Sequence, residues 1–224
     1  MQTPGEKYLI EYLIKSIKRL GRKANIINIG ANTSLVIEKE LDEAGCDFVE
    51  DRTDIIDSSV EYKKFSKRYI CSVEKMDEVE KNKYDIAFAN FVLEHIPDLN
   101  SSASEINRII KNGGSFVTSI PNPQAPEFVI SKFTPHSFHQ WIRGEGEGHE
   151  AHETEYSYKS VGEFVKIFES KGFKLKEEFF KPFTFGYLYR FPIVNIFSKI
   201  YDKLILKTGA RRLMGNVCLV FEKK

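Results

Sequence analysis

The stretch YDIAFANFVLEHIPDLNSSASEINRIIKNGGSFVTSIPNP, residues 84–123, decides the fold. It begins with a short apolar segment, YDIAFAN (84–90), which is typical of a buried strand. A helical pattern follows at 101–111, and the NGG at 112–114 supplies its stop. A second apolar segment, SFVTSIP (115–121), comes directly after the stop. A strand, a helix and a strand joined by short connections indicate a parallel sheet covered by helices.

The same alternation extends in both directions from this stretch. It predicts further strands at 25–29, 46–50, 68–73, 173–180 and 216–223, and helices at 6–20, 35–44 and 159–171, with a short charged helix after the strand at 68–73. Residues 54–66 are ambiguous. Because the alternation runs through most of the chain, we expect one α/β domain that spans residues 1–224.

Two stretches, 123–158 and 182–214, interrupt the alternation, and we expect both to be accessory insertions that cover a substrate. The first contains RGEGEGHEAHETE (143–155), which is typical of a mobile loop. The second is aromatic and is predicted to contain a helix at 192–206. It can cover a sheet edge, form a dimer surface or line an apolar pocket. Contact with a membrane surface, through Lys199, Lys203, Lys207, Arg211 and Arg212, is a further alternative.

The composition limits the partners of the chain. Its 224 residues include 33 Lys and Arg and 32 Asp and Glu, for a net charge of +1. That balance provides no basic field, so we expect no nucleic-acid partner. The three cysteines are far apart and form no zinc pattern, which favours a reduced, cytoplasmic setting. No apolar run reaches the roughly 18 residues that a membrane-spanning helix needs.

The opening stretch resembles the core of class I S-adenosylmethionine-dependent methyltransferases. Several pieces occur in the family's order and spacing: Asp85 at the start of a strand, LEHIPD at 93–98, EINRIIKNGG at 105–114 and PNP at 121–123. The resemblance covers residues 24–122 well and the last helix and strands loosely. It implies an α/β, doubly wound, Rossmann-like sheet of seven strands. That sheet is mainly parallel, with an antiparallel last strand and helices on both faces.

The resemblance implies S-adenosylmethionine as the cofactor, with its methionine part against the turn after the strand at 25–29. The family favours an acid and three glycines in this turn. The chain has a degenerate version of the motif, made of Asn28, Gly30, Ala31, Asn32, Thr33 and Ser34. Gly30 stands where the backbone must come close, and Asn32 tolerates a positive φ. Ser34 can cap the following helix. A dinucleotide is a weaker alternative, because pyrophosphate needs more glycines.

Two further groups are expected to bind this cofactor. The family places an acid at the end of the second strand, where it accepts hydrogen bonds from the ribose, and a carboxylate suits that role. Glu50 is the first choice here and Asp51 the second. Ser72, Val73 and Glu74 are expected beside the adenine. Ser72 replaces the usual aspartate, and Glu74 is a candidate substitute.

The residues after the fourth strand are expected to face both cofactor and acceptor. Asn90 is a candidate cofactor ligand and His95 a candidate base. His136 and His139 are also candidate bases, since the loop after the fifth strand commonly covers the substrate in this family. A positioned base contributes about 10²–10⁴-fold to the rate. Alternatively, His95 only orients its own helix through a backbone hydrogen bond.

A metal site in the histidine-rich loop is a weaker hypothesis. His149 and His152, together with Glu150 and Glu153, supply suitable ligand types. The surrounding glycines favour a solvated or substrate-covering loop instead, so no metal site is predicted.

These features predict a methyltransferase that acts on a small molecule, with oxygen the preferred acceptor atom and nitrogen the next. No (D/N)PP(Y/F) sequence follows the fourth strand, which argues against methylation of nucleic-acid bases. One alternative is a non-catalytic relative that has lost productive cofactor binding, suggested by Asn28, Asn32, Ser34 and Ser72. Another is a peripheral-membrane enzyme or binding module that uses residues 182–214.

Overall fold

The computed structural model describes residues 2–57, 59–131, 157–187 and 192–224. They form a seven-stranded sheet in the order β3-β2-β1-β4-β5-β7-β6. The strands are β1 (Ala24–Ile29), β2 (Phe48–Asp54), β3 (Phe65–Ile70), β4 (Tyr84–Asn90), β5 (Ile110–Pro121), β6 (Phe173–Lys181) and β7 (Asn216–Lys223). β7 is antiparallel to both of its neighbours, and the pairs among β3, β2, β1, β4 and β5 are parallel. The predicted doubly wound sheet with an antiparallel last strand is confirmed.

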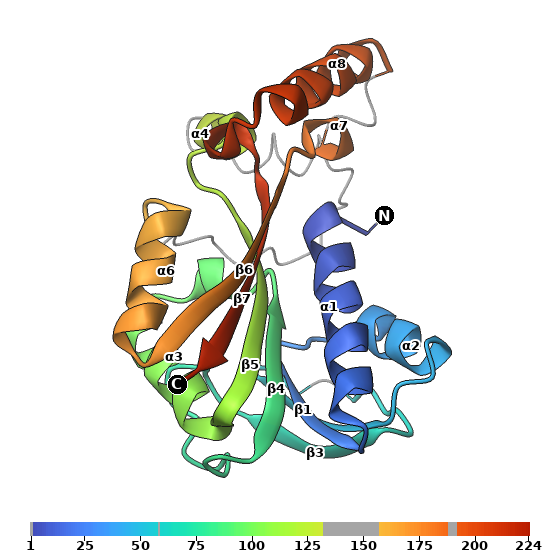
Figure 1. Cartoon of the computed structure of the whole chain (residues 1–224), viewed down its shortest axis with the longest axis vertical. Coiled ribbons are helices and arrows are strands. Elements are labelled where there is room, and N and C mark those ends of the chain that lie inside the picture. The colour runs from blue at the N-terminus through green and yellow to red at the C-terminus, as the bar shows by residue number, and fades with distance from the viewer. Residues whose placement is uncertain (1, 58, 132–156, 188–191) are drawn as a thin grey trace.

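Helices cover both faces of the sheet (Figure 1). One face carries α1 (Pro4–Leu20) and α2 (Val36–Glu43), and the other carries α3 (Leu99–Ile109) and α6 (Val161–Ser170). A separate group lies beyond one end of the sheet, where Figure 1 shows α4 (Pro126–Ser131), α7 (Thr184–Tyr187) and α8 (Pro192–Thr208). Short 3₁₀ turns, η1 (Leu93–His95) and η2 (Arg211–Leu213), complete the described elements.

The helices begin and end at residues with clear physical roles. Thr3 is the N-cap residue of α1, and its hydroxyl accepts a hydrogen bond from the Glu6 amide. The C-cap residue of α1 is Gly21, with φ +63°. α3 begins earlier than predicted because the Asp98 carboxylate accepts bonds from the amides of Asn100 and Ser101. These caps satisfy backbone groups that a helix terminus otherwise leaves without partners.

Two strands lie away from their predicted positions. β2 runs from Phe48 to Asp54 rather than over 46–50, and β3 runs from Phe65 to Ile70 rather than over 68–73. The charged helix expected after the third strand is also wrong, because residues 71–83 form turns and irregular backbone. Arg108 of α3 holds these turns by donating to the carbonyl oxygens of Met76 and Val79. Residues 71–83 are therefore held in place by hydrogen bonds to a side chain of α3 and not by helical hydrogen bonds of their own.

Asp85 aligns the amino ends of three neighbouring strands. Its carboxylate, at the start of β4, accepts the Asn25 amide of β1 at 2.9 Å. It also accepts bonds from Arg22 at 2.6 Å and from Lys111 of β5 at 2.7 Å. Burial alone would raise the pKa of Asp85, but these partners outweigh burial and lower the pKa to about 2. With the amino ends fixed together, the carboxyl ends of β1, β4 and β5 also meet at one edge.

No helix in the described part of the chain is long and apolar enough to cross a membrane.

Candidate active site

A cleft of about 720 Å³ opens at the carboxyl ends of β1, β2 and β4. Its lining includes the turn Gly30 to Ser34, the segment Thr53 to Asp57, and the residues that follow β4. Ligands of open α/β sheets bind outside the carboxyl ends of the strands, where the strand order reverses. Because the order reverses between β1 and β4, the cleft lies where the fold predicts a ligand.

The turn after β1 contains two residues with positive φ. Gly30 has φ +68° and Asn32 has φ +46°. A Cβ atom at Gly30 would lie 2.6 Å from both γ-carbons of Val92, which is shorter than any ordinary carbon contact. The expectation that Asn32 accommodates a glycine-like conformation is confirmed. A glycine is therefore required at 30, whereas asparagine suffices at 32.

The predicted helix cap at Ser34 is wrong. Leu35 occupies the cap position of α2, and its side chain makes no capping bond. The Ser34 hydroxyl lies 3.4 Å from the Val36 amide, a long contact across a local turn. The turn needs another source of order, because it lacks two of the family's glycines and a side-chain cap.

Arg52, in the middle of β2, supplies that order. Its Nη2 atom donates to the carbonyl oxygen of Ala31 at 3.1 Å and to that of Ser34 at 2.8 Å. The guanidinium also lies 4.5 Å above the Phe65 ring. Arg52 is only 2% exposed, so its bonds to these carbonyls form away from solvent, where they are strong. The side chain thereby fixes both ends of the turn.

Two glutamates share the buried surroundings of Arg52. The Glu38 carboxylate lies 3.4 Å from Nη2 and accepts a bond from Asn28 at 2.9 Å, while Glu50 lies 3.3 Å from Nε. Burial raises the pKa of Glu50 well above its usual value, and the nearby Glu38 raises it further. Asn28 is therefore a buried partner of Glu38, which itself lines the cleft.

The prediction that Glu50 and Asp51 end the second strand is wrong. Both lie inside β2, both are buried, and neither lines the cleft. Asp51 instead accepts bonds at 2.6 Å from Lys83 and from the Tyr84 hydroxyl. Burial and the bond to Asp51 raise the pKa of Tyr84. Asp51 thus has hydrogen-bond partners inside the protein, whereas Glu50 lies beside Arg52 and neither of its carboxylate oxygens accepts a hydrogen bond.

Asp54 is the acid that ends β2 and borders the cleft. Its Oδ2 atom accepts the Asn32 amide at 2.7 Å, and its Oδ1 accepts the Ile56 amide at 3.2 Å. Each oxygen keeps room for a further donor, because an ionised carboxylate offers about four acceptor positions. The sequence signal for Asp54 was present, since it closes the acidic run of FVEDRTD, but the wrong strand boundary concealed it.

The segment after β3 borders the cleft in part. Val73 and Cys71 line it, whereas Ser72 and Glu74 do not. The Ser72 hydroxyl donates to Glu74 at 3.0 Å, and Glu74 accepts the Asp98 amide at 2.8 Å. The side chains of Ser72 and Glu74 thus hold the backbone near α3, and the lining contributed here is apolar.

The residues after β4 form the opposite wall. Asn90, Phe91 and His95 all line the cleft. Phe91 has φ +55°, a conformation that costs energy for a bulky residue and recurs at functional sites. Glu94 is 5% exposed, and burial raises its pKa to about 8. His95 Nε2 lies 4.0 Å from Oε1 of Glu94, so a carboxyl group and an imidazole lie close together beside the cleft.

Some predicted site residues cannot be placed. His136 and His139 lie outside the described residues, as do His149, His152 and the two glutamates of the metal hypothesis. Among the residues that are described, no cluster of three His, Cys, Asp or Glu side chains could hold a metal ion.

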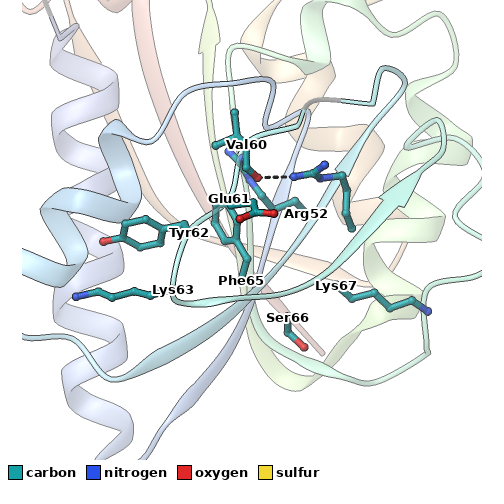
Figure 2. A pocket seen from close by; sticks show the side chains of 9 residues that line it. Arg52, Val60, Glu61, Tyr62, Lys63, Phe65, Ser66 and Lys67 are labelled. Carbon is teal, nitrogen blue, oxygen red and sulfur yellow. Dashed lines mark hydrogen bonds between the residues drawn. The ribbon is translucent and has the colours of Figure 1, made fainter.

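A second, smaller cavity of about 490 Å³ lies beside the amino-terminal half of β3. Figure 2 shows its lining, with Arg52, Val60 and Phe65 at the centre and Lys63 and Lys67 pointing outward. Arg68 also lines the cavity and donates to the Val60 carbonyl. This cavity does not border the carboxyl ends of the strands, so we place the active site in the larger cleft.

A family model described as a methyltransferase domain matches residues 6–178, which include the whole lining of the larger cleft. The chain belongs to the methyltransferase-domain family. Residues 24–122, where the sequence resemblance was strongest, lie inside the matched part. No curated protein sequence gives a significant match.

Solved structures of methyltransferases share the fold. An S-adenosylmethionine-dependent methyltransferase from Mesorhizobium loti has a TM-score of 0.61 at 12% identity, with 98% of each chain covered. Geranyl diphosphate C-methyltransferase from Streptomyces coelicolor has a TM-score of 0.56 at 12% identity, with 98% of this chain and 76% of that chain covered. The 1,6-didemethyltoxoflavin-N1-methyltransferase of Burkholderia thailandensis has a TM-score of 0.56 at 13% identity, covering 96% and 78%. The predicted class I S-adenosylmethionine-dependent methyltransferase is confirmed in family and fold.

Proposed function

We propose that this methyltransferase transfers a methyl group from S-adenosylmethionine to a small-molecule acceptor in the larger cleft, to oxygen in preference to nitrogen. The observation that carries the proposal is the close approach at Gly30. A left-handed turn packs there against Val92 at the carboxyl end of β1, inside the matched family region. Because Gly30 has no side chain, the turn packs directly against the residues after β4, at the edge of the sheet where ligands of this fold bind.

The lining of the cleft fits this cofactor. When bound, S-adenosylmethionine supplies the activated methyl group, and the protein supplies position and electrostatics. Asp54 has acceptor positions left for the ribose hydroxyls, and Val73 with Cys71 offers apolar surface for the adenine. The volume of about 720 Å³ lies within the range typical of small-molecule sites.

Glu38 compensates for the acid that the turn lacks. The family's acidic position is Asn28 here, but its Nδ2 atom donates to the Glu38 carboxylate at 2.9 Å, and both residues line the cleft. Negative charge thus returns to the same place from α2. We assign Glu38 the electrostatic attraction of the cofactor's ammonium group, and Ala31 and Asn32 the backbone contacts to its methionine part.

The acceptor is assigned to the wall formed after β4. We assign Asn90 to the border between cofactor and acceptor, and His95 the removal of a proton from a hydroxyl group, because both line the cleft. One structure of similar fold is named a geranyl diphosphate C-methyltransferase, and another holds bound 1,6-didemethyltoxoflavin, which supports a small molecule as the acceptor. We also propose that residues 123–158 and 182–214 are insertions that cover the substrate within one domain, and that His136 and His139 contribute from the first.

The test is formation of S-adenosylhomocysteine and of methylated product in a panel of phenols, alcohols and amines. We expect turnover with at least one hydroxyl acceptor. His95→Gln should lower kcat by about 10²-fold or more while the cofactor affinity is unchanged. Turnover with amines only would refute the oxygen assignment. Absence of cofactor binding to a folded protein, with no turnover on any acceptor, would favour the non-catalytic relative suggested by Asn28 and Ser72.

A further inference from the structure

Over most of its length, α8 has the reverse of the usual polarity of a surface helix. Four of its described side chains are buried, and three of them are polar, Asn195, Ser198 and Asp202; the fourth is Ile205. The apolar residues Ile196, Phe197, Ile200 and Leu204 are between 56% and 68% exposed. Surface helices ordinarily turn their apolar face toward the core. An outward apolar face on a folded helix indicates a partner outside the described fold.

The inward face is held by specific polar contacts, so the helix is not free to rotate. The Asp202 carboxylate accepts the amides of Thr184 and Phe185 at 3.3 and 3.2 Å, which caps α7. Asn195 donates to the Phe185 carbonyl at 2.7 Å. A rotation of α8 that turned the apolar residues inward would break these hydrogen bonds. The exposed face is therefore a fixed property of the fold.

The exposed face also carries positive charge without acidic residues. At 3.6 residues per turn, Ile196, Ile200 and Leu204 lie along one line of α8. Lys203 and Lys207 lie beside that line, and Lys199 lies one turn before Lys203. All three lysines are exposed. The one acid of the helix is Asp202, which faces inward. Apolar side chains flanked by lysines are the pattern of a helix that lies in the interface of an anionic membrane.

We propose that the outer face of α8, defined by Ile196, Phe197, Ile200 and Leu204 with Lys199, Lys203 and Lys207, docks on an anionic lipid surface. Figure 1 shows α8 beyond the end of the sheet at which β5 and β6 finish, the same edge as the cleft. Docking through this face brings the carboxyl edge of the sheet toward the lipid. The proposal concerns binding only and does not depend on methyl transfer.

The test is co-sedimentation of the full chain with vesicles of phosphatidylcholine alone and of phosphatidylcholine with phosphatidylserine. The wild-type protein should sediment with the anionic vesicles and much less with the neutral ones. Phe197→Asp with Ile200→Asp should lower the partition coefficient by more than about tenfold. Lys199→Gln, Lys203→Gln and Lys207→Gln should each lower it about fivefold. Ile70→Asp is the matched control, because Ile70 is 61% exposed on the far edge strand, and should change nothing.

Three results would overturn the proposal, provided that circular dichroism shows folded protein. One is the absence of sedimentation with anionic vesicles. A second is sedimentation that Phe197→Asp with Ile200→Asp leaves unchanged. The third is a dimer in light scattering that the same double variant converts to a monomer while vesicles bind neither protein, since a second copy of the chain would then be the partner of α8.

Discussion

The Nη2 atom of Arg52 lies 2.8 Å from the carbonyl oxygen of Ser34 and 3.1 Å from that of Ala31. One buried side chain from β2 thus holds the turn that follows β1. The turn has one glycine, and these two hydrogen bonds hold its backbone in the conformation that further glycines would make easier to adopt. The conformation of the turn after β1 therefore depends on a side chain from a second strand, β2.

Arg52→Lys should weaken cofactor binding roughly tenfold, because the shorter lysine side chain does not extend to the position of Nη2, the one atom that contacts both carbonyls and Glu38. Calorimetric titration with S-adenosylhomocysteine measures the effect. Arg108→Lys is the matched control, since Arg108 also donates to two carbonyls, those of Met76 and Val79, away from the cleft. It should lower the melting temperature without changing the affinity, and equal affinity losses in both variants would contradict the assignment.

Gly30→Ala should abolish measurable cofactor binding, because its Cβ would meet the side chain of Val92 at 2.6 Å. Gly113→Ala is a control for the backbone strain alone. Gly113 has φ +74°, and nothing lies within 4 Å of a Cβ placed there. Both variants should lose about 1–2 kcal/mol of stability from the left-handed conformation, but only Gly30→Ala should lose binding. Binding retained by a folded Gly30→Ala protein would place the cofactor elsewhere.

Asp54→Ala should weaken cofactor binding, but Asp54 also holds the Asn32 amide, so a weaker affinity alone is ambiguous. A ligand lacking one ribose hydroxyl separates the two roles. In the wild-type protein, removing that hydroxyl should cost about tenfold in affinity, and in Asp54→Ala it should cost almost nothing. An equal cost in both proteins would mean that Asp54 does not contact the ribose.

Glu94→Gln should change how stability depends on pH. Burial raises the pKa of Glu94 from 4.5 to about 8, so the folded protein keeps a proton that the unfolded chain has lost. The free energy of unfolding therefore falls as pH rises through this window, by about 1.4 kcal/mol per pH unit. Glutamine has no such proton, so the variant should become more stable relative to wild type from pH 5 to about 8.

Denaturant unfolding at several pH values measures the difference in free energy of unfolding between Glu94→Gln and wild type. A difference that stays constant with pH would contradict the prediction. Glu11→Gln, at an exposed site on α1, is the control.

Some strands begin and end at the predicted residues, whereas the predicted bounds of others are wrong, and both outcomes have physical reasons. β4 and β7 lie where they were expected, because each contains an unbroken run of buried apolar residues, 86–89 in β4 and 217–221 in β7. The position of β2 was predicted wrongly because four of its seven residues, Glu50, Asp51, Arg52 and Asp54, have ionisable side chains, which are unusual in a buried strand. Their partners Glu38, Lys83 and Tyr84 come from other elements, and no local pattern reveals such pairs.

The candidate site shows the same division. Gly30, Asn32 and His95 were found because the motif places them directly after strands, and all three line the cleft. Asp54, Glu38 and Arg52 were missed, since their roles depend on the register between β1 and β2, in which Asn28 lies opposite Arg52. A sequence alone does not give that register when the strand boundary is uncertain by a few residues.

Calorimetric titration of the purified chain with S-adenosylmethionine and with S-adenosylhomocysteine tests the central claim most directly. We predict saturable binding of both ligands at one site in the micromolar range, with binding lost in Gly30→Ala and kept in Gly113→Ala. The absence of binding to a folded protein at millimolar ligand would contradict the account, and would show that the turn held by Arg52 no longer forms a cofactor site.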